Sequence, residues 1–346
     1  MATLKRTEEM RDRIYSCVGV GDCRAACKGP YSNPIAEATC PFLRHGHRFE
    51  STLPRGHFST ARALLTDRIE PSEGLAETFY QCTLCGGCRE VCNNCENADW
   101  AIPAREGIGD HTEIWEGIRA DLVDAGVAPM PRHKEILESV TNNNNPYFEE
   151  GTSRLAWVPL EFPLVPDNPD AAFFVGCTGA YRLAESPTNF LRIASQGNFK
   201  VAMTPDESCC GSVALRCGAE EVGRKMAEHN AEVFKALGVS KIVTNCAGCY
   251  RTLKIDYPKL LDDWDFEVVH SLEVVDELLK SGALQVSQKI DGDITYHDPC
   301  HLGRHCGIYD APRNIINAIR GGNFVEMRRH RNYAYCCGAG GGVKSG

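Results

Sequence analysis

The sequence predicts a mixed fold, α+β/α/β, in which a helical N-terminal domain is followed by a duplicated βαβ domain with parallel sheets. Two observations lead to this prediction. The 19 cysteines fall into two blocks, which a cysteine-free stretch at 96–176 separates. After Asp170, short apolar or β-branched runs alternate with helical segments, and this alternation is typical of βαβ units.

The composition limits the class of protein. With 346 residues, 43% of them hydrophobic, the chain is long enough to build two cores. The start, MATLKRTEEMRDRIYSC, is charged, and no run approaches the roughly eighteen apolar residues of a membrane span. We therefore expect a cytoplasmic protein without an intrinsic membrane span. A net charge of -9 argues against a nucleic-acid partner, because phosphate contacts need a basic face.

Nineteen cysteines are many for a cytosolic chain. Cytosolic thiols stay reduced, so clustered cysteines there serve as metal ligands or redox groups more often than as disulfides. A disulfide framework is typical of short secreted chains instead. The cysteines therefore predict metal or redox chemistry.

The spacing of apolar residues divides the chain into three parts. We expect a first domain at 1–110, a helical connector and linker at 111–165, and a second domain at 166–346. In the connector, HTEIWEGIRADLVDAG and PRHKEILESV carry apolar residues at helical spacing. The proline-bearing WVPLEFPLVPDNPD then predicts an ordered surface crossing between the two domains.

The second domain contains an internal repeat. Its predicted strands are AAFFVG, FKVAM, KIVTN, FEVVH and ITYH. In both copies a strand leads to a cysteine, Cys177 or Cys300, and then come a helix, a strand and a Cys-Cys-Gly doublet. Matching contexts around the two doublets favour duplication, with the first motif at 171–256 and the second at 290–346. Ligands of parallel sheets gather at the carboxyl ends of the strands.

The most specific signal is the run Cys82-x2-Cys85-x2-Cys88-x3-Cys92. This spacing wraps three thiolates around one cubane [4Fe–4S] cluster and sends the fourth to a neighbouring cluster. The run departs from the usual pattern because asparagine, not proline, follows Cys92. Cys95 is therefore an alternative to Cys92 as the outgoing ligand, and we favour Cys92.

An upstream partner of this run is degraded. Cys17, Cys23 and Cys27 are present, but Val20 stands where a cysteine is expected, and Cys40, which precedes Pro41, restores the count. We assign Cys82, Cys85, Cys88 and Cys27 to one cubane, and Cys17, Cys23, Cys40 and Cys92 to the other. The N-terminal domain thus resembles a two-cluster, two-[4Fe–4S] ferredoxin-like segment. A zinc ribbon is the alternative, although paired C-x2-C knuckles would fit it better.

The second cysteine block resembles a known domain. Cys177, Cys209, Cys210, Cys246 and Cys249 match the CCG (cysteine-rich) domain of heterodisulfide reductase catalytic subunits, which is also found in the glycolate oxidase iron–sulfur subunit. With the ferredoxin-like segment before it, the order resembles the fused D-type (C/B) subunit. Similar subunits serve electron-transfer complexes of anaerobes, including class II benzoyl-CoA reductase complexes.

The resemblance implies a cofactor as well. Each complete CCG motif in the catalytic members holds a noncubane [4Fe–4S] cluster on five thiolates, which nominates the five cysteines of the first motif. Adjacent cysteines can reach different irons of such a cluster, and Gly211 would let the backbone approach it closely. A single zinc ion bound by four thiolates is the alternative at a CCG site.

The second motif is incomplete in this sequence. Cys300, Cys336 and Cys337 match the pattern, but the chain reaches Gly346 before a C-x2-C pair could follow. Either the sequence is truncated here, which we favour, or this half carries no complete cluster. We therefore expect one or two noncubane clusters in addition to the two cubanes.

These features predict an iron–sulfur electron-transfer subunit of a cytoplasmic, heterodisulfide-reductase-like redox complex. Electrons would pass through the two cubanes to the CCG domain. No G-x-G-x-x-G fingerprint follows a predicted strand, so a flavoprotein and other electron-transfer subunits are the expected partners. The alternatives are a catalytic disulfide (heterodisulfide) reductase subunit, a glycolate-oxidase-type iron–sulfur subunit and a zinc scaffold. No catalytic residue is assigned.

Overall fold

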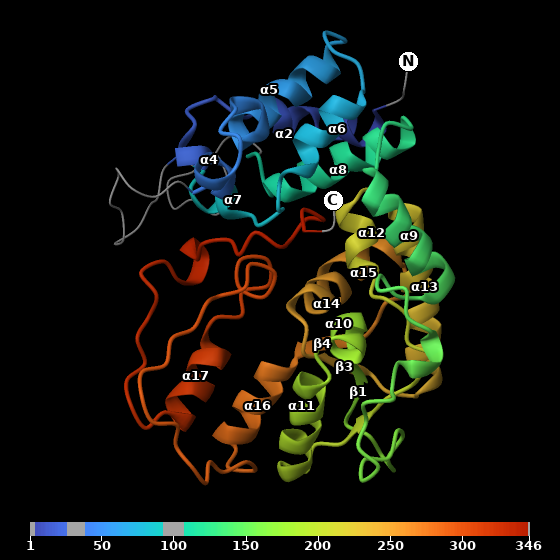
Figure 1. Ribbon diagram of the computed structural model, residues 1–346, viewed down its shortest axis with the longest axis vertical. Helices are drawn as coiled ribbons and strands as arrows, with labels where there is room; N and C mark the ends of the chain where they lie inside the picture. The colour runs from blue at the N-terminus through green and yellow to red at the C-terminus, as the bar shows by residue number, and fades with distance from the viewer. Residues whose placement is uncertain (1–3, 26–38, 93–106, 345–346) are drawn as a thin grey trace.

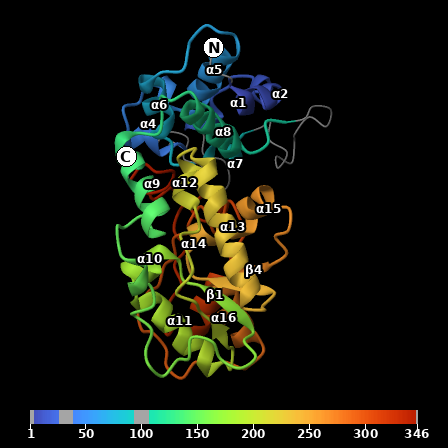
Figure 2. The same cartoon turned by 90° about the vertical axis from the view of Figure 1, so that its right-hand side faces the viewer.

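The computed structural model of the chain describes residues 4–25, 39–92 and 107–344. The N-terminal helices form the upper half of the molecule in Figure 1, and a sheet with its covering helices forms the lower half. The C-terminal segment returns to the junction between them (Figures 1 and 2). Among the described residues, no helix is both long enough and apolar enough to cross a membrane.

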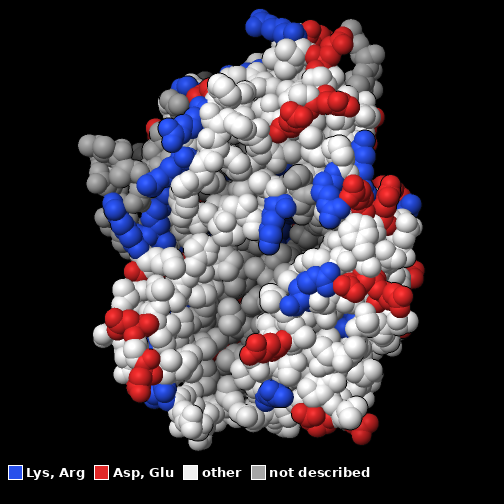
Figure 3. All heavy atoms as spheres, viewed as in Figure 1, with Lys and Arg blue, Asp and Glu red and all other residues white. Residues whose placement is uncertain are grey.

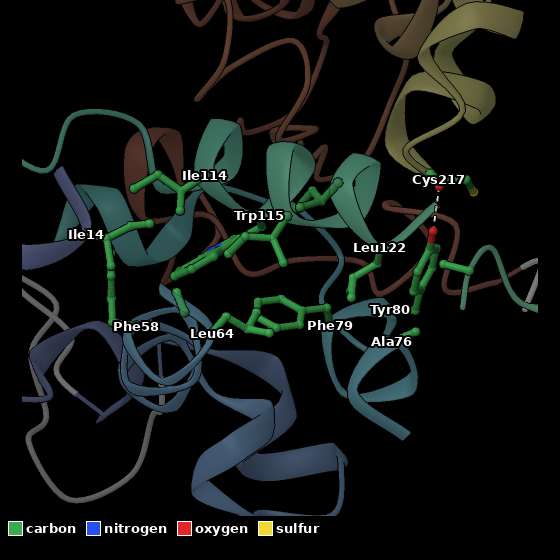
Figure 4. Close-up of a cluster of buried hydrophobic side chains, with 14 of the residues drawn as sticks. Ile14, Phe58, Leu64, Ala76, Phe79, Tyr80, Ile114, Trp115, Leu122 and Cys217 are labelled. Atoms are coloured by element: carbon green, nitrogen blue, oxygen red, sulfur yellow. Dashed lines mark hydrogen bonds between the residues drawn. The ribbon is translucent and has the colours of Figure 1, made fainter. Parts of the chain in front are cut away.

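The N-terminal half is helical, as the sequence predicts. Its core contains Ile14, Phe58, Phe79 and Trp115, which are almost fully buried and lie together in Figure 4. The helices that supply this core and its surroundings are α1 (Lys5–Glu9), α2 (Arg11–Tyr15), α3 (Asp22–Ala25), α4 (Pro41–His45), α5 (Pro54–Leu65), α6 (Glu73–Tyr80), α7 (Gly87–Glu90) and α8 (His111–Asp124), with a 3-10 turn, η1, at Glu50–Thr52.

Helices α8 and α9 (Pro131–Asn143) occupy the predicted connector, but each belongs to a core. The Asp110 carboxylate caps α8 by accepting the Thr112 backbone N–H at 2.8 Å. Helix α8 then buries its apolar face in the N-terminal core. Helix α9 packs against Cys177 and Cys209 of the other half through Ile136 and Val140. The two helices therefore anchor both halves.

The lower half contains a four-stranded parallel sheet in the order β2-β1-β3-β4. The strands coincide with four of the predicted runs: β1 (Ala171–Phe174), β2 (Val201–Ala202), β3 (Lys241–Thr244) and β4 (Glu267–His270). The helices around them are α10 (Gly176–Tyr181), α11 (Glu185–Gln196), α12 (Ser212–Arg216), α13 (Glu220–Ala236), α14 (Ala247–Arg251), α15 (Tyr257–Leu260) and α16 (Ser271–Lys280). A 3-10 turn, η2 (Gly151–Ser153), precedes the sheet, and a π-helical turn, η3 (Thr252–Asp256), follows α14.

Alternate residues of β1 face opposite sides of the sheet. Ala171 and Phe173 pack against α11 and α16, whereas Ala172 and Phe174 pack against α13, α14 and η3. Burial on both faces explains why the strand is a continuous apolar run. The cysteines of the first motif follow the carboxyl ends of β1, β2 and β3, so the sheet brings them to one edge.

The second motif does not repeat this sheet. Helix α17 (Asp310–Ile319) packs against α16, and the 3-10 turn η4 (Arg331–Tyr333) follows it. The predicted strand at 294–297 makes only an isolated parallel bridge from Ile294 to Phe324. Parallel strands need both faces covered, and Ile290 and Val325 are about half exposed. The prediction of a sheet in each motif is therefore wrong for the second motif within the described residues.

The buried guanidinium of Arg119, on α8, joins the two halves. It donates to the carbonyl oxygens of Phe79 and Cys82 at 2.7 and 2.6 Å, within the N-terminal half. It also donates to those of Arg216 and Gly341, both at 2.7 Å, in the other half. Arg119 is fully buried, so these four carbonyls satisfy a charged group that has no access to water.

Arg119→Met should therefore destabilise the protein by about 3 kcal/mol or more, because four buried carbonyls lose a charged donor. Chemical denaturation followed by circular dichroism measures this loss. Arg132→Met is the matched control, since the Arg132 side chain is more than half exposed and should cost less than about 0.5 kcal/mol. Equal stabilities of the two variants would contradict the role of Arg119.

Candidate functional site

The five cysteines of the first motif line one cavity. Cys177 follows β1, Cys209 and Cys210 follow β2, and Cys246 and Cys249 follow β3; all five border a cavity of about 500 Å³. Figure 3 shows the face of the molecule hollowed between its halves, with Lys and Arg side chains at the rim. The basic residues among those lining the cavity are Arg132, Arg216 and Lys344.

The five thiols form a continuous row. Hydrogen bonds connect Cys177 to Cys209, Cys209 to Cys210, Cys210 to Cys249 and Cys249 to Cys246. Hydrogen bonding from Cys209 lowers the pKa of Cys210 to about 6, and hydrogen bonding from Cys249 lowers that of Cys246 to about 6. Hydrogen bonding to Cys209 together with burial raises the pKa of Cys177. The pKa is thus lowered at two thiols, Cys210 and Cys246, whereas it is raised at Cys177, Cys209 and Cys249.

A buried ion pair supports the first thiol of this row. Arg154 donates to Glu207 Oε1 at 2.8 Å and to Cys177 Sγ at 3.6 Å. Glu207 in turn accepts the backbone N–H groups of Val175 and Gly176 at 2.8 and 2.9 Å. The pair therefore fixes the turn that presents Cys177. Nothing in the sequence pattern distinguishes Arg154 or Glu207 from surface charges, and the sequence analysis missed both.

Gly176, not Gly211, makes room at the thiols. A Cβ at Gly176, where φ is +71°, would lie 2.8 Å from Cys249 Sγ, so only glycine fits here. Gly211 also has a positive φ, but it packs against the backbone of Gly223 on α13. The close approach of the Gly211 backbone to a cofactor stays a prediction.

A second cavity, in the N-terminal half, is lined by Cys40, Cys82, Cys85 and Cys88. Burial raises the pKa of the Cys40 thiol, and electrostatic interaction with Cys82 and Cys85 adds to this rise. This arrangement differs from the grouping in the sequence analysis, which placed Cys40 with Cys17, Cys23 and Cys92. The arrangement still agrees with the ferredoxin pattern, in which the cysteine that precedes a proline ligates the cluster held by the other cysteine motif.

The remaining thiols of the N-terminal block lie nearby. The Cys23 thiol interacts electrostatically with Cys92, Cys17 and Cys40. Burial raises the pKa of Cys23 to about 12 and also raises that of Cys17. Cys27 and Cys95, the other candidates of this block, lie outside the described residues, so their assignment stays a prediction.

The second motif contacts the N-terminal run. Cys336 hydrogen-bonds with Cys300 and with Cys85, and its thiol donates to Thr83 Oγ1 at 3.3 Å. Cys337 is exposed. The sequence analysis treated Cys300 and Cys336 as part of a separate site, and it did not anticipate their contact with Cys85.

The turn after Cys300 lies between the two cavities. Arg304 donates to the Cys85 carbonyl oxygen at 2.7 Å, and His305 Nε2 hydrogen-bonds with the Leu84 carbonyl oxygen at 3.1 Å. The His305 ring lies 5.1 Å from that of His301, which lines the five-thiol cavity. Burial lowers the pKa of both histidines, so both rings are neutral.

Comparison with known proteins places this arrangement in a family. The model of a cysteine-rich domain, CCG, matches residues 171–254 and 294–346, which fall within the two motifs. The D-type subunit of the dihydromethanophenazine:CoB–CoM heterodisulfide reductase of Methanosarcina barkeri is 36% identical over 96% of this chain and 80% of its own length. The chain belongs to the heterodisulfide reductase D family.

Two further relatives match this chain over a smaller share of their own length. The corresponding heterodisulfide reductase protein of Methanosarcina mazei is 37% identical over 79% of this chain and 65% of its own length. The B-type subunit of fumarate reductase (CoM/CoB) from Methanothermobacter marburgensis is 30% identical over 99% of this chain and 62% of its own length. The chain thus spans less than two-thirds of these two relatives. No solved structure matches it.

The cysteine thiols that line the two cavities suit iron–sulfur clusters, which are the cofactors of this family. Cys thiolates are the usual ligands of such clusters, and four or five thiols converge on each cavity. No group of three His, Cys, Asp or Glu side chains within residues 4–25, 39–92 and 107–344 has the arrangement of a single-metal site.

Arg154→Met should destabilise the protein by about 3–5 kcal/mol, because it leaves the Glu207 carboxylate buried without its partner. The double variant Arg154→Met/Glu207→Gln should recover part of the loss, since the buried charge is gone. Urea denaturation of both variants tests this. The proposed pairing would be contradicted if the double variant lost as much free energy of unfolding as Arg154→Met and Glu207→Gln lose together, or more.

Proposed function

We propose that this heterodisulfide reductase D family member is the iron–sulfur electron-transfer component of a multi-subunit redox complex. The observation that carries the proposal is the row of five thiols around one cavity at the carboxyl edge of a parallel sheet. When bound there, a noncubane [4Fe–4S] cluster supplies one-electron chemistry. Cys177, Cys209, Cys210, Cys246 and Cys249 would hold it.

Two cubane clusters would pass electrons to this noncubane cluster. Cys40, Cys82, Cys85 and Cys88 supply the four thiolates of one, because they line the same cavity. Cys17, Cys23 and Cys92 would hold the other, with Cys27 as the sequence-based candidate for the fourth thiolate. The neighbouring Cys23 and Cys40 would keep the two clusters close enough to exchange electrons.

The partners are proposed from the relatives of the chain. One relative is named EtfAB:quinone oxidoreductase, from Syntrophomonas wolfei, and is 30% identical over 95% of this chain. We propose a flavoprotein and further electron-transfer subunits as partners, and the cytoplasm as the location. Cys300, Cys336 and Cys337 would belong to a second noncubane site, with zinc as the alternative metal at a CCG site.

A catalytic role in disulfide reduction is the second candidate. The five-thiol cavity is large and open, and Arg132, Arg216 and Lys344 line it, so a small anionic disulfide could enter. Arg216, however, already pairs with Glu116 at 2.8 Å and with Asp256. Turnover of a disulfide by the chain with its partners would favour catalysis, whereas reduction of the clusters without turnover would favour electron relay.

Iron and zinc analysis of the anaerobically purified chain tests the cluster content. Two cubanes and the noncubane cluster of the first motif predict about twelve irons per chain, to which a filled second motif would add about four, and Cys209→Ser/Cys210→Ser should remove about four. In the reduced wild-type protein, EPR should show interacting cubane signals. Stoichiometric zinc with about eight irons would instead assign zinc to the first motif.

The cysteine grouping has its own test. Cys40→Ser should disturb the same EPR signal as Cys85→Ser, because both thiols line one cavity, and it should leave the signal that Cys17→Ser disturbs. Cys217→Ser is the control, since Cys217 is a buried thiol apart from both cavities. If Cys40→Ser instead disturbs the signal that depends on Cys17, the cavity-based grouping is wrong.

A further inference from the structure

Two buried polar side chains line the cavity of Cys40, Cys82, Cys85 and Cys88 without a hydrogen-bond partner among the described residues. They are Thr39 through Oγ1 and Trp115 through Nε1. Thr39 is 5% exposed and Trp115 0%, so water does not reach them. The sequence analysis assigned neither of them a role.

Such groups are costly when they have no partner. A buried donor without an acceptor costs about 1–3 kcal/mol, and native proteins pair nearly all of them. The indole N–H of Trp115 can only donate, so it needs an acceptor. Four thiols line the same cavity, and cluster sulfurs are the acceptors expected there.

We propose that the indole N–H of Trp115 and the hydroxyl of Thr39 donate hydrogen bonds to sulfur atoms of the cluster held by Cys40, Cys82, Cys85 and Cys88. The inference rests on the proposed cubane at this cavity and adds the residues that set its reduction potential. Because reduction adds negative charge, N–H and O–H donors stabilise the reduced form more than the oxidised form.

The surroundings hold Trp115 in place for this role. The His57 ring lies edge-on to the Trp115 ring with centroids 5.1 Å apart, and it stacks on Phe79 at 4.7 Å. Phe58 packs on Trp115 at 4.7 Å. Figure 4 shows Phe58, Phe79 and Trp115 together in the N-terminal core. These rings therefore hold Trp115 in place, and its N–H would act on the reduction potential without carrying the electron.

Trp115→Phe keeps the aromatic packing and removes the N–H, and Thr39→Val keeps the shape and removes the hydroxyl. Each should lower the equilibrium constant for one-electron reduction of this cluster up to about tenfold, which corresponds to about 59 mV. EPR-monitored redox titration of the full chain measures it. Trp157→Phe and Thr141→Val are the matched controls, because Trp157 donates to the Arg154 carbonyl and Thr141 to that of Leu137, both away from the cavity.

A spectroscopic measurement separates the hydrogen-bond inference from the proposed cubane on which it rests. Proton ENDOR of the reduced cluster before and after exchange into D₂O should show an exchangeable coupling that Trp115→Phe removes and Trp157→Phe keeps. A chain whose iron content and EPR signal survive Cys85→Ser would overturn the proposed cubane itself. An intact cubane whose potential and exchangeable coupling are the same in Trp115→Phe, Thr39→Val and the controls would overturn the hydrogen-bond inference alone.

Discussion

The guanidinium of Arg119 is the interaction on which the junction of the molecule depends. It is buried, and four backbone carbonyls accept its protons. One of these carbonyls belongs to Cys82, and another belongs to Gly341, so the thiol-bearing run and the C-terminal segment are fixed by the same charge. The electrostatic field of Arg119 also opposes the burial that raises the pKa of Cys82 to about 11. The cost of burying this charged group is thus offset by the four carbonyls that accept its hydrogen bonds.

The same arrangement recurs at other cysteine-bearing turns. Arg62 donates to the Cys17 carbonyl oxygen, Arg304 to that of Cys85, and Arg154 to the Cys177 thiol. Each turn therefore has a cation close to its sulfur atoms. Sulfur ligands and iron–sulfur clusters carry negative charge, so nearby cations favour their ionised and reduced forms. In a chain with net charge -9, each of these three turns thus places a guanidinium next to a cysteine.

The sequence predicts the elements that local pattern controls. Strands such as Ala171–Phe174 and helices such as Glu220–Ala236 lie where alternation and helical spacing place them. The grouping of the five thiols of the first motif came from the resemblance to the CCG domain, and all five line one cavity of the structure. The contact of Cys336 with Cys85, in contrast, joins residues 251 positions apart in the chain, and no local spacing encodes it. The second motif does not form its predicted sheet within the described residues. Its strands are not covered on both faces, and parallel pairing needs that burial.

The turn that contains His301 and His305 also fixes how far apart the two thiol-lined cavities lie. His305 bonds to the backbone of Leu84 beside one cavity, and His301, 5.1 Å away, lines the other. Arg304, between them, bonds to Cys85 and to the segment before Cys336. Any displacement of this turn would therefore move groups at both cavities together. Because Leu302 and Arg304 in this turn are buried, the turn is held against both cavities by packing as well as by its hydrogen bonds.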